Sequence, residues 1–189
     1  MNRRLIFIMI LVSAVTASAQ VNRTVDTIRK RYSDVAEKAR LAESDEEQGQ
    51  YGELVMNELE INKLNHPWRA IGIHQDTYKF FYRGGDSEEH MYPDELVLVK
   101  VTRSESSRSY NEEFLYSAKG ELMFYFQKAE NDEMSPAERR VYFLSSTRAI
   151  IVEDGNTRNR LTAKDAPTVK EILATSVRLK SIFATSIKL

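Results

Sequence analysis

The sequence predicts an α+β domain: an antiparallel β-meander of about six or seven strands, with an N-terminal and a C-terminal helix packed on the sheet. Residues 110–154 contain four short runs with the two-residue alternation of strands, and turns divide them into two hairpins. Apolar positions with helical spacing precede and follow this stretch. Because the second hairpin is apolar on both faces, we expect helices of the same chain or a partner to cover both.

Residues 1–19 are typical of a secretory signal peptide. Two arginines form a positive start, an apolar run covers residues 5–12, and Ala17-Ser18-Ala19 has the small-x-small pattern of a cleavage site. A membrane anchor is the alternative, but an apolar run this short does not span a bilayer. We therefore expect export, removal of residues 1–19 and a mature chain that begins at Gln20.

Length and composition fit a single α+β domain over residues 20–189. The whole chain has 189 residues, of which 42% are hydrophobic and 29% charged, outside the range typical of disorder. Cysteine is absent, which excludes disulfides, thiol catalysis, thiolate metal sites and a lipidated cysteine. The formal charge of −1 indicates no general affinity for nucleic acid. We expect a periplasmic or secreted protein with no integral membrane segment after signal removal.

A narrow apolar stripe predicts the N-terminal helix. Its positions lie alternately four and three residues apart, which favours docking on the sheet over a coiled-coil partner. The helix should fray in an acidic run, residues 43–47, and stop near Gly49. The stripe consists of Val21, Val25, Ile28, Tyr32, Val35, Ala39 and Ala42.

Strand alternation also precedes the hairpins. Asn65-His66-Pro67-Trp68 ends the first of these strands, and a serine-rich connection over residues 103–109 follows the last. A polar loop over residues 84–93 separates the second strand from the third. The three strands are expected at residues 53–63, 77–82 and 95–103.

The first hairpin joins residues 110–117 to residues 122–127 through Ala118-Lys119-Gly120. A type I turn followed by Gly120 in the left-handed conformation fixes the register of the two strands. The expected pairs are Tyr116 with Leu122, Phe114 with Phe124, and Glu112 with Phe126.

The second hairpin turns at Ser146-Thr147, between residues 139–145 and residues 148–154. A two-residue turn again fixes the register. The expected pairs are Phe143 with Ile150, Val141 with Val152, Tyr142 with Ile151, and Arg140 with Glu153.

The C-terminal helix follows a basic, polar loop over residues 155–166. Thr168-Val169-Lys170-Glu171 has the spacing of a capping box and should open the helix. Lys180 lies within the apolar face, so its ammonium must reach water or a carboxylate, with Glu112 as one candidate. Basic residues would also allow a detachable or membrane-surface helix, but docking on the sheet is favoured. These basic residues are Lys170, Arg178, Lys180 and Lys188, and the apolar face comprises Val169, Ile172, Leu173, Ser176, Phe183 and Ile187.

His66, His74 and His90 are the candidate metal ligands. His74-Gln75-Asp76 puts two possible ligands on one side of an extended segment, and Glu88-Glu89-His90 could join them from the next loop. The spacing matches no known metal motif, so we predict no metal and no cofactor.

No catalytic set is visible in the sequence. Glu112 and Glu113 are adjacent, so in a strand they point to opposite faces and cannot share a substrate. Glu112 should either lie on the apolar ladder, neutral or beside a cation, or stay wet at the rim of the sheet. The serines in the connection between strands form no nucleophile elbow and belong to a flexible loop. They are Ser104, Ser106, Ser107 and Ser109.

Aromatic residues on the predicted strands could stack on bases or sugars. Strands place such residues in any core, however, and no basic stripe accompanies them, so we expect no nucleic-acid partner. The residues concerned are Tyr78, Phe80, Tyr82, Tyr125 and Tyr142.

Three runs share a pattern of turn and strand residues: Tyr110-Asn111-Glu112-Glu113-Phe114-Leu115-Tyr116, Gly120 with Leu122-Met123-Phe124, and Arg139-Arg140-Val141-Tyr142-Phe143. These runs resemble a pattern in a family of small exported proteins of Bacteroidetes-type bacteria. The resemblance covers the middle third of the chain and consists of turn and strand residues. It implies export and brings no activity or functional residue with it.

The sequence therefore favours an exported, non-enzymatic binding or interaction module of the cell envelope, with a protein or small-molecule partner of unknown identity. We predict no catalytic, cofactor-binding or metal-binding residues. One alternative is a metal-dependent or other hydrolase that uses His74, Asp76 and His90. Another is a carrier that holds an apolar ligand beneath the C-terminal helix.

Cleavage after Ala19 gives the first testable prediction. Protein recovered from the envelope fraction should begin at Gln20, because the small residues at positions 17 and 19 fit the signal peptidase. Intact-mass analysis decides this. A chain that retains Met1 would contradict export.

Overall fold

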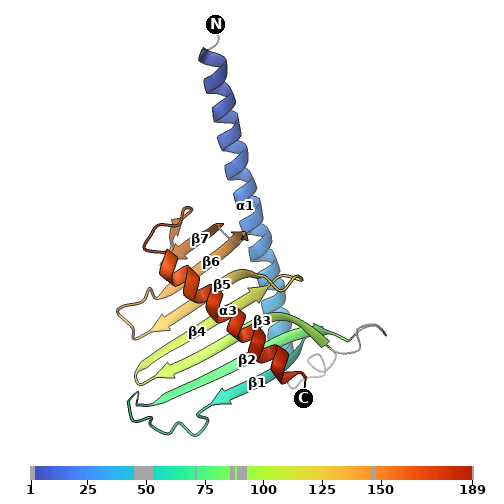
Figure 1. The fold of residues 1–189 in the computed structure, drawn as a ribbon, viewed down its shortest axis with the longest axis vertical. Helices are drawn as coiled ribbons and strands as arrows, with labels where there is room; N and C mark the ends of the chain where they lie inside the picture. The colour runs from blue at the N-terminus through green and yellow to red at the C-terminus, as the bar shows by residue number, and fades with distance from the viewer. Residues whose placement is uncertain are drawn as a thin grey trace.

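The computed structural model describes residues 3–44, 53–70, 72–85, 88, 93–145 and 148–188, with side chains from residue 20 onward. Within these residues, eight antiparallel strands form one sheet in the order β1 to β8, so neighbours in sequence are neighbours in the sheet. Helix α3 crosses one face of the sheet, and the C-terminal half of α1 lies against the other (Figure 1). The predicted α+β meander with a helix at each end is confirmed. Its elements are α1 (Arg3–Ala42), β1 (Val55–Ile61), β2 (His74–Gly84), β3 (Pro93–Glu105), β4 (Arg108–Tyr116), β5 (Leu122–Glu130), β6 (Glu138–Ser145), β7 (Arg148–Glu153), β8 (Asn156–Arg158) and α3 (Ala166–Ser186).

Residues directly opposite one another on neighbouring strands line up as rows across the sheet, because side chains alternate between its faces. Among the rows on the face toward α3, two adjacent ones differ in character. The row that we call the apolar row comprises Phe80, Val99, Phe114, Tyr125, Val141 and Ile151. The row that we call the polar row comprises Tyr78, Val101, Glu112, Gln127, Arg139 and Glu153. Helix α3 packs on the apolar row through its buried Ile172, Leu179 and Phe183, as the predicted docking requires.

The opposite face of the sheet packs against α1. Four positions of the predicted stripe, Val25, Ile28, Val35 and Ala39, are buried in the core on this side. Docking of this helix on its own sheet is therefore confirmed. The strand residues beneath it are Phe81, Leu98, Leu115, Phe124, Tyr142 and Ile150.

The N-terminal end of α1 extends beyond the sheet in Figure 1. The helix is continuous from Arg3 through the expected cleavage position. Among the described residues, no helix combines the length and the apolar character that crossing a membrane requires. The expected helix stop at Gly49 and the turn at Ser146-Thr147 lie outside the described residues.

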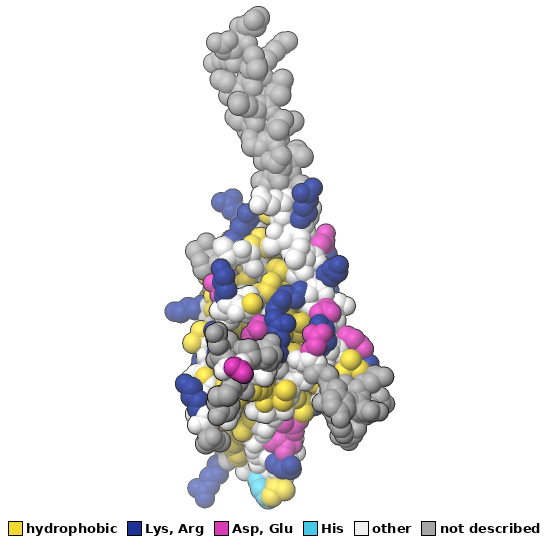
Figure 2. Space-filling view, turned by 90° about the vertical axis from the view of Figure 1, so that its right-hand side faces the viewer, with side chains coloured by type: hydrophobic (Ala, Val, Ile, Leu, Met, Phe, Trp, Pro, Cys, Tyr) yellow, Lys and Arg dark blue, Asp and Glu magenta, His cyan; other side chains and the backbone are white. Residues whose placement is uncertain are grey.

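Charged side chains of both signs are interspersed on the face that Figure 2 shows. Near the end of α1, Glu43 lies 3.4 Å from the ammonium of Lys79 and 3.3 Å from that of Lys100. These pairs join the helix to β2 and β3, although each is partly exposed and contributes little to stability by itself.

Both hairpins contain an irregularity that the sequence did not reveal. In the first, Tyr116 pairs with Leu122 as predicted, but a shift between Leu115 and Tyr116 moves every earlier pair by one residue. In the second, a shift between Phe143 and Ser145 has the same effect. The predicted pairs beyond these points are wrong because a β-bulge adds one residue to one strand. The observed pairs are Phe114 with Tyr125, Glu112 with Gln127, Phe143 with Ala149, Tyr142 with Ile150, Val141 with Ile151, Arg140 with Val152, and Arg139 with Glu153.

Two predicted loops contain strand. Asp154 and Gly155 have φ values of 47° and 82°, the pattern of a type I′ turn, and this turn folds β8 back on β7 within the loop expected at residues 155–166. The prediction of six or seven strands is therefore too low. The connection expected over residues 103–109 is reduced to the turn residues Ser106 and Ser107, because β3 and β4 extend further than the alternation indicated.

Helix α3 begins two residues before the predicted capping box, at Ala166. Its N-cap residue is Asp165, which makes no side-chain bond to the helix. The Asp165 carboxylate instead accepts hydrogen bonds from the backbone and hydroxyl of Thr162 and from Arg158. The capping box at Thr168 and Glu171 is therefore a wrong prediction, because Pro167 already occupies the first turn of the helix.

The Lys180 side chain is exposed, and the partners of Glu112 are Arg103 and Tyr125 instead. Its ammonium donates a hydrogen bond of 2.6 Å to the carbonyl oxygen of Gly120, in the turn of the first hairpin. This contact ties the second half of α3 to the β4–β5 turn.

We predict that Gly120→Ala lowers the free energy of unfolding by about 1 kcal/mol, because a Cβ resists positive φ. Gly120 has a φ of 70°, and a Cβ there would lie 2.8 Å from the ammonium of Lys180. Gly155→Ala is the matched comparison: its φ of 82° carries the same backbone cost, but its Cβ would meet no atom within 4 Å, so the difference between the two variants reports the contact with Lys180. Urea denaturation of both variants measures the effect. An unchanged midpoint for Gly120→Ala would contradict the assigned turn.

Candidate functional site

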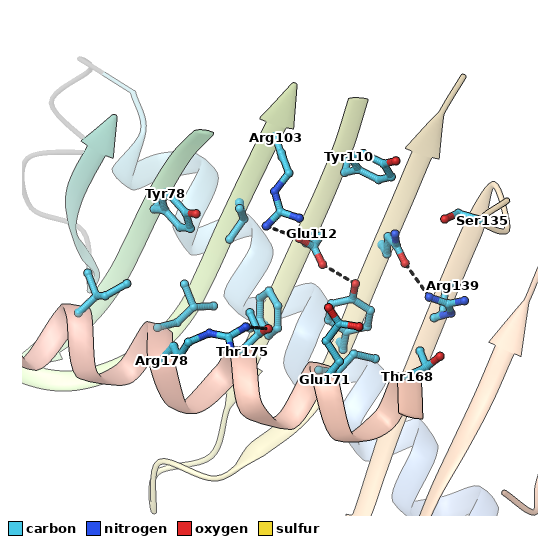
Figure 3. Close-up of a pocket in the computed structure, with 17 residues that line it drawn as sticks. Tyr78, Arg103, Tyr110, Glu112, Ser135, Arg139, Thr168, Glu171, Thr175 and Arg178 are labelled. Carbon is cyan, nitrogen blue, oxygen red and sulfur yellow. Dashed lines mark hydrogen bonds and ion pairs between the residues drawn. The ribbon is translucent and has the colours of Figure 1, made fainter. Parts of the chain in front are cut away.

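A cavity of about 350 Å³ lies between α3 and the sheet. It forms because α3 rests on the apolar row, so that a space remains between the helix and the polar row beside it. The polar row and the sheet residues next to it form the floor, and one side of α3 forms the wall (Figure 3). The lining residues are Tyr78, Val101, Arg103, Tyr110, Glu112, Phe114, Tyr125, Gln127, Ser135, Arg139, Thr168, Glu171, Ile172, Thr175, Arg178, Leu179 and Ile182.

Glu112 lies at the centre of the floor. Its Oε1 accepts a hydrogen bond of 2.5 Å from the hydroxyl of Tyr125, and its Oε2 lies 3.8 Å from Nη2 of Arg103. The Glu112 side chain is only 14% exposed. The expected cationic partner is thus present, and the prediction of a wet position at the rim is wrong.

Arg103 lies between two carboxylates. Besides Glu112, it faces Asp76, whose Oδ1 is 3.4 Å from the Arg103 Nε. The other oxygen of Asp76 accepts a hydrogen bond of 2.9 Å from the hydroxyl of Tyr78. Burial alone would lower the pKa of Arg103, but the two carboxylates outweigh it and raise this pKa, so the guanidinium stays charged.

On the other half of the floor, Gln127 and Arg139 begin a chain of charge-assisted hydrogen bonds that continues beyond the cavity. Arg139 donates to the side-chain oxygen of Gln127 at 3.0 Å and to Glu153 at 2.7 Å. Arg158 donates to the second oxygen of Glu153 and to Asp165, both at 2.8 Å. Because Asp165 is the N-cap residue of α3, this chain links the cavity floor to the start of the helix.

The carboxylates of this chain are held in their ionised form. Burial would raise the pKa of Glu153, but hydrogen bonds from Arg139 and Arg158 hold it below its ordinary value. The pKa of Asp165 is also lowered, since bonds from Thr162 and Arg158 outweigh the effect of its burial. Both groups therefore remain charged well into the acidic range.

Tyrosines frame the cavity. Tyr78 and Tyr110 are half-buried, and the Tyr110 hydroxyl donates to Asp132 at 2.8 Å. Burial raises the pKa of Tyr78, Tyr110 and Tyr125, and the hydrogen bonds to their carboxylate partners raise it further. All three are therefore neutral donors at physiological pH.

The α3 wall contributes hydroxyl and charged groups. Thr168 and Glu171 project from the helix toward the sheet in Figure 3. Further along the helix, the Arg178 guanidinium donates to the Thr175 hydroxyl at 2.7 Å. Donors and acceptors thus converge on the cavity from both layers.

The structure brings two of the three hydrolase candidates together. Nε2 of His74 lies 3.4 Å from Oδ2 of Asp76, and Nδ1 lies 3.9 Å from Glu105. The His74 ring contacts Trp68, with 4.9 Å between ring centroids. His90 lies outside the described residues. Among the residues that the structure describes, no group of three potential ligands could hold a metal ion.

The remaining sequence candidates divide between the two faces of the sheet. Glu113 points away from Glu112, as predicted, and accepts a hydrogen bond of 2.8 Å from Tyr32 of α1. Tyr142 also faces α1, and its hydroxyl accepts a bond from Arg29. Phe80 and Tyr82 lie in the core, whereas Tyr78 and Tyr125 line the cavity.

Sequence reasoning missed most of the cavity. Arg103, Gln127 and Arg139 each look like an ordinary polar position on an alternating strand. Only the bulged register shows that Gln127 and Arg139 share a row with Glu112. One sequence signal could have revealed the cavity: in successive strands, the residues change from apolar to polar toward the same end.

The chain matches no protein-family model, no curated protein and no solved structure. What the cavity can bind therefore follows from its own geometry.

Glu153 gives a stability prediction with a defined pH dependence. Glu153→Gln should cost about 2 kcal/mol near neutral pH, because Arg139 and Arg158 lose a shared charged partner. The pKa of Glu153 is lower in the folded chain than its ordinary value of about 4.3, so the stabilisation is present above that pH. It is lost as the pH falls through the folded value.

Urea unfolding as a function of pH tests this. The wild type and Glu153→Gln should converge in acid. Glu130→Gln is the control, since the 50% exposed Glu130 side chain pairs only at the surface and should change little. A constant difference between wild type and Glu153→Gln down to strongly acidic pH would contradict the ion-pair assignment.

Proposed function

We propose that the chain is an exported, non-enzymatic binding module of the cell envelope, and that the cavity beside α3 is its ligand site. The observation that carries the proposal is the convergence of polar side chains from sheet and helix on one preformed cavity with an aromatic border. Small-molecule sites in proteins are concave and combine apolar surface with a few well-placed polar groups. The leader-like residues 1–19 support the exported location.

The hydrogen bonds and ion pairs on the cavity floor favour ligand binding over catalysis. Glu112 is fixed by Tyr125 and Arg103, and Arg139 is fixed by Gln127 and Glu153. Such interlocked pairs hold donors and acceptors in set orientations, which lowers the entropic cost of capturing a ligand. Protonation of Glu112 would remove one charge from its pair with Arg103, whereas binding of a ligand leaves the pair intact.

A carrier of an apolar ligand is the second candidate. A wider hollow of about 1130 Å³ lies at the C-terminal end of α3, and the apolar residues Leu96, Phe183 and Ile187 line part of it. Charged residues share this lining, including Glu95 and Lys180. An apolar molecule would therefore find only a partial match there.

Filling the cavity tests the proposed site. Thr168→Trp should abolish binding of small soluble fragments by occupying the space beside Arg139, whereas Lys170→Trp, on the exposed side of the same turn, should leave it intact. A panel of anionic, cationic, polyhydroxylated and apolar fragments would be screened by ligand-observed NMR. Thermal unfolding would confirm that both variants fold.

Two outcomes would contradict the proposed site. One is that no fragment binds the wild type. The other is that binding persists unchanged in the folded Thr168→Trp variant, since the fragments would then occupy another surface. Hits confined to apolar fragments and insensitive to Thr168→Trp would favour the carrier.

A further inference from the structure

We infer that the ligand of this cavity is an uncharged, polyhydroxylated ring, that is, a monosaccharide or disaccharide unit. The inference rests on the proposed function, because it names the ligand class of the same site. It follows from the pairing of opposite charges on the cavity floor, the hydrogen bonds that already engage the tyrosine hydroxyls, and the kind of hydrogen-bonding groups on the floor.

The charged groups on and beneath the cavity floor are paired with groups of opposite charge. Arg103 lies between Asp76 and Glu112, and Arg139 and Arg158 share Glu153. Asp165 is a further partner of Arg158, and the α3 wall adds one glutamate and one arginine. An anionic ligand would meet these carboxylates, and a cationic ligand would compete with the arginines for them. A neutral ligand disturbs none of these pairs.

The floor nevertheless keeps bonding capacity for a neutral oxygen. Both ion pairs of Arg103, at 3.4 Å and 3.8 Å, are longer than a charge-assisted hydrogen bond. Its N–H groups can therefore donate to a ligand while the charges remain compensated. Glu112 lies beside it as an acceptor. A hydroxyl both donates and accepts, so neighbouring sugar hydroxyls match this arrangement of a guanidinium next to a carboxylate.

The tyrosines offer ring surface rather than hydroxyls. The hydroxyl groups of Tyr78 and Tyr110 are bonded to Asp76 and Asp132. In Figure 3 the two side chains flank Arg103, one on each side. Ile182, which is 39% exposed, adds aliphatic surface from α3. A sugar ring has a face of C–H groups and a rim of hydroxyls, which suits apolar walls around a polar centre.

The size of the cavity agrees with such a ligand. Its volume of about 350 Å³ is near the lower end of the range for ligand pockets. A single ring or a pair of rings fits, and a longer glycan would have to leave through the open side.

Direct binding measurements test the ligand class. The full folded chain would be titrated with glucose, galactose, mannose, N-acetylglucosamine, cellobiose and maltose by saturation-transfer NMR and calorimetry. Inorganic phosphate, acetate, methylammonium and decanoate serve as anionic, cationic and apolar probes. We expect at least one sugar to bind, with an affinity that stays constant between about 0.05 and 0.5 M salt because no net charge is exchanged.

Tyr110 provides a paired test of the aromatic wall. Tyr110→Phe keeps the ring and should retain sugar affinity within about two-fold, whereas Tyr110→Ala should lose about ten-fold. If Tyr110→Ala does not fold, Ile182→Asp, at an exposed position of α3, tests the same apolar wall and should also weaken binding.

The outcomes separate this inference from the proposed function. Binding of phosphate, acetate or methylammonium that weakens with salt, without any sugar, would overturn the ligand class while the cavity remained a binding site. Binding of decanoate alone would also overturn the ligand class and leave the cavity as a binding site. Sugar binding that is unaffected by both Tyr110→Ala and Thr168→Trp would place the sugar elsewhere and overturn the inference. A failure of every probe and every fragment to bind the wild type would overturn the proposed function itself.

Discussion

Cross-strand register is the constraint on which the rest of this structure depends. A slip of one residue along any strand would move its side chains to the other face, since the side-chain period of a strand is two. Glu112, Gln127 and Arg139 would then point toward α1, into the core formed by Leu115 and Phe124. Each of the two bulges shifts the pairing of its hairpin by one residue from the register that the turn alone would set. This shift is what aligns the polar side chains of neighbouring strands in one row.

The position of α3 follows from these rows. The helix buries Ile172, Leu179 and Phe183 on the apolar row. Burial of these apolar side chains offsets the conformational entropy that is lost when the helix is ordered. It cannot shift onto the polar row without stripping water from Arg139 and its partners. The bond from Arg158 to Asp165 fixes its first turn, and the bond from Lys180 to Gly120 fixes its second half. The cavity is the space left beside a helix that is held at its first turn and in its second half.

The general architecture could be predicted from the sequence, because it depends on periodicity. The stripe from Val21 to Ala42 fixes which face of α1 is buried, and a hairpin that is apolar on both faces requires two covering layers. The bulges could not be predicted, since the sequence at Leu144 has no glycine or other turn residue to mark one. The site was missed for the same reason: its floor is defined by register across five strands. β8 was predictable, because Asp154-Gly155 is a known hairpin signal.

The polar row costs stability, so stability alone does not explain why it is present. Apolar residues at positions 112, 127 and 139 would extend the apolar row and let α3 settle lower on the sheet. They would also remove the desolvation cost of two partly buried arginine–carboxylate networks. The cavity would then close. A row of paired charges therefore acts in two ways, because it stops the helix at the edge of the apolar row and lines the resulting space with oriented donors and acceptors. Sites that break the pattern of a well-packed core are where function is most often found, and in the described part of this chain the clearest such break is the polar row.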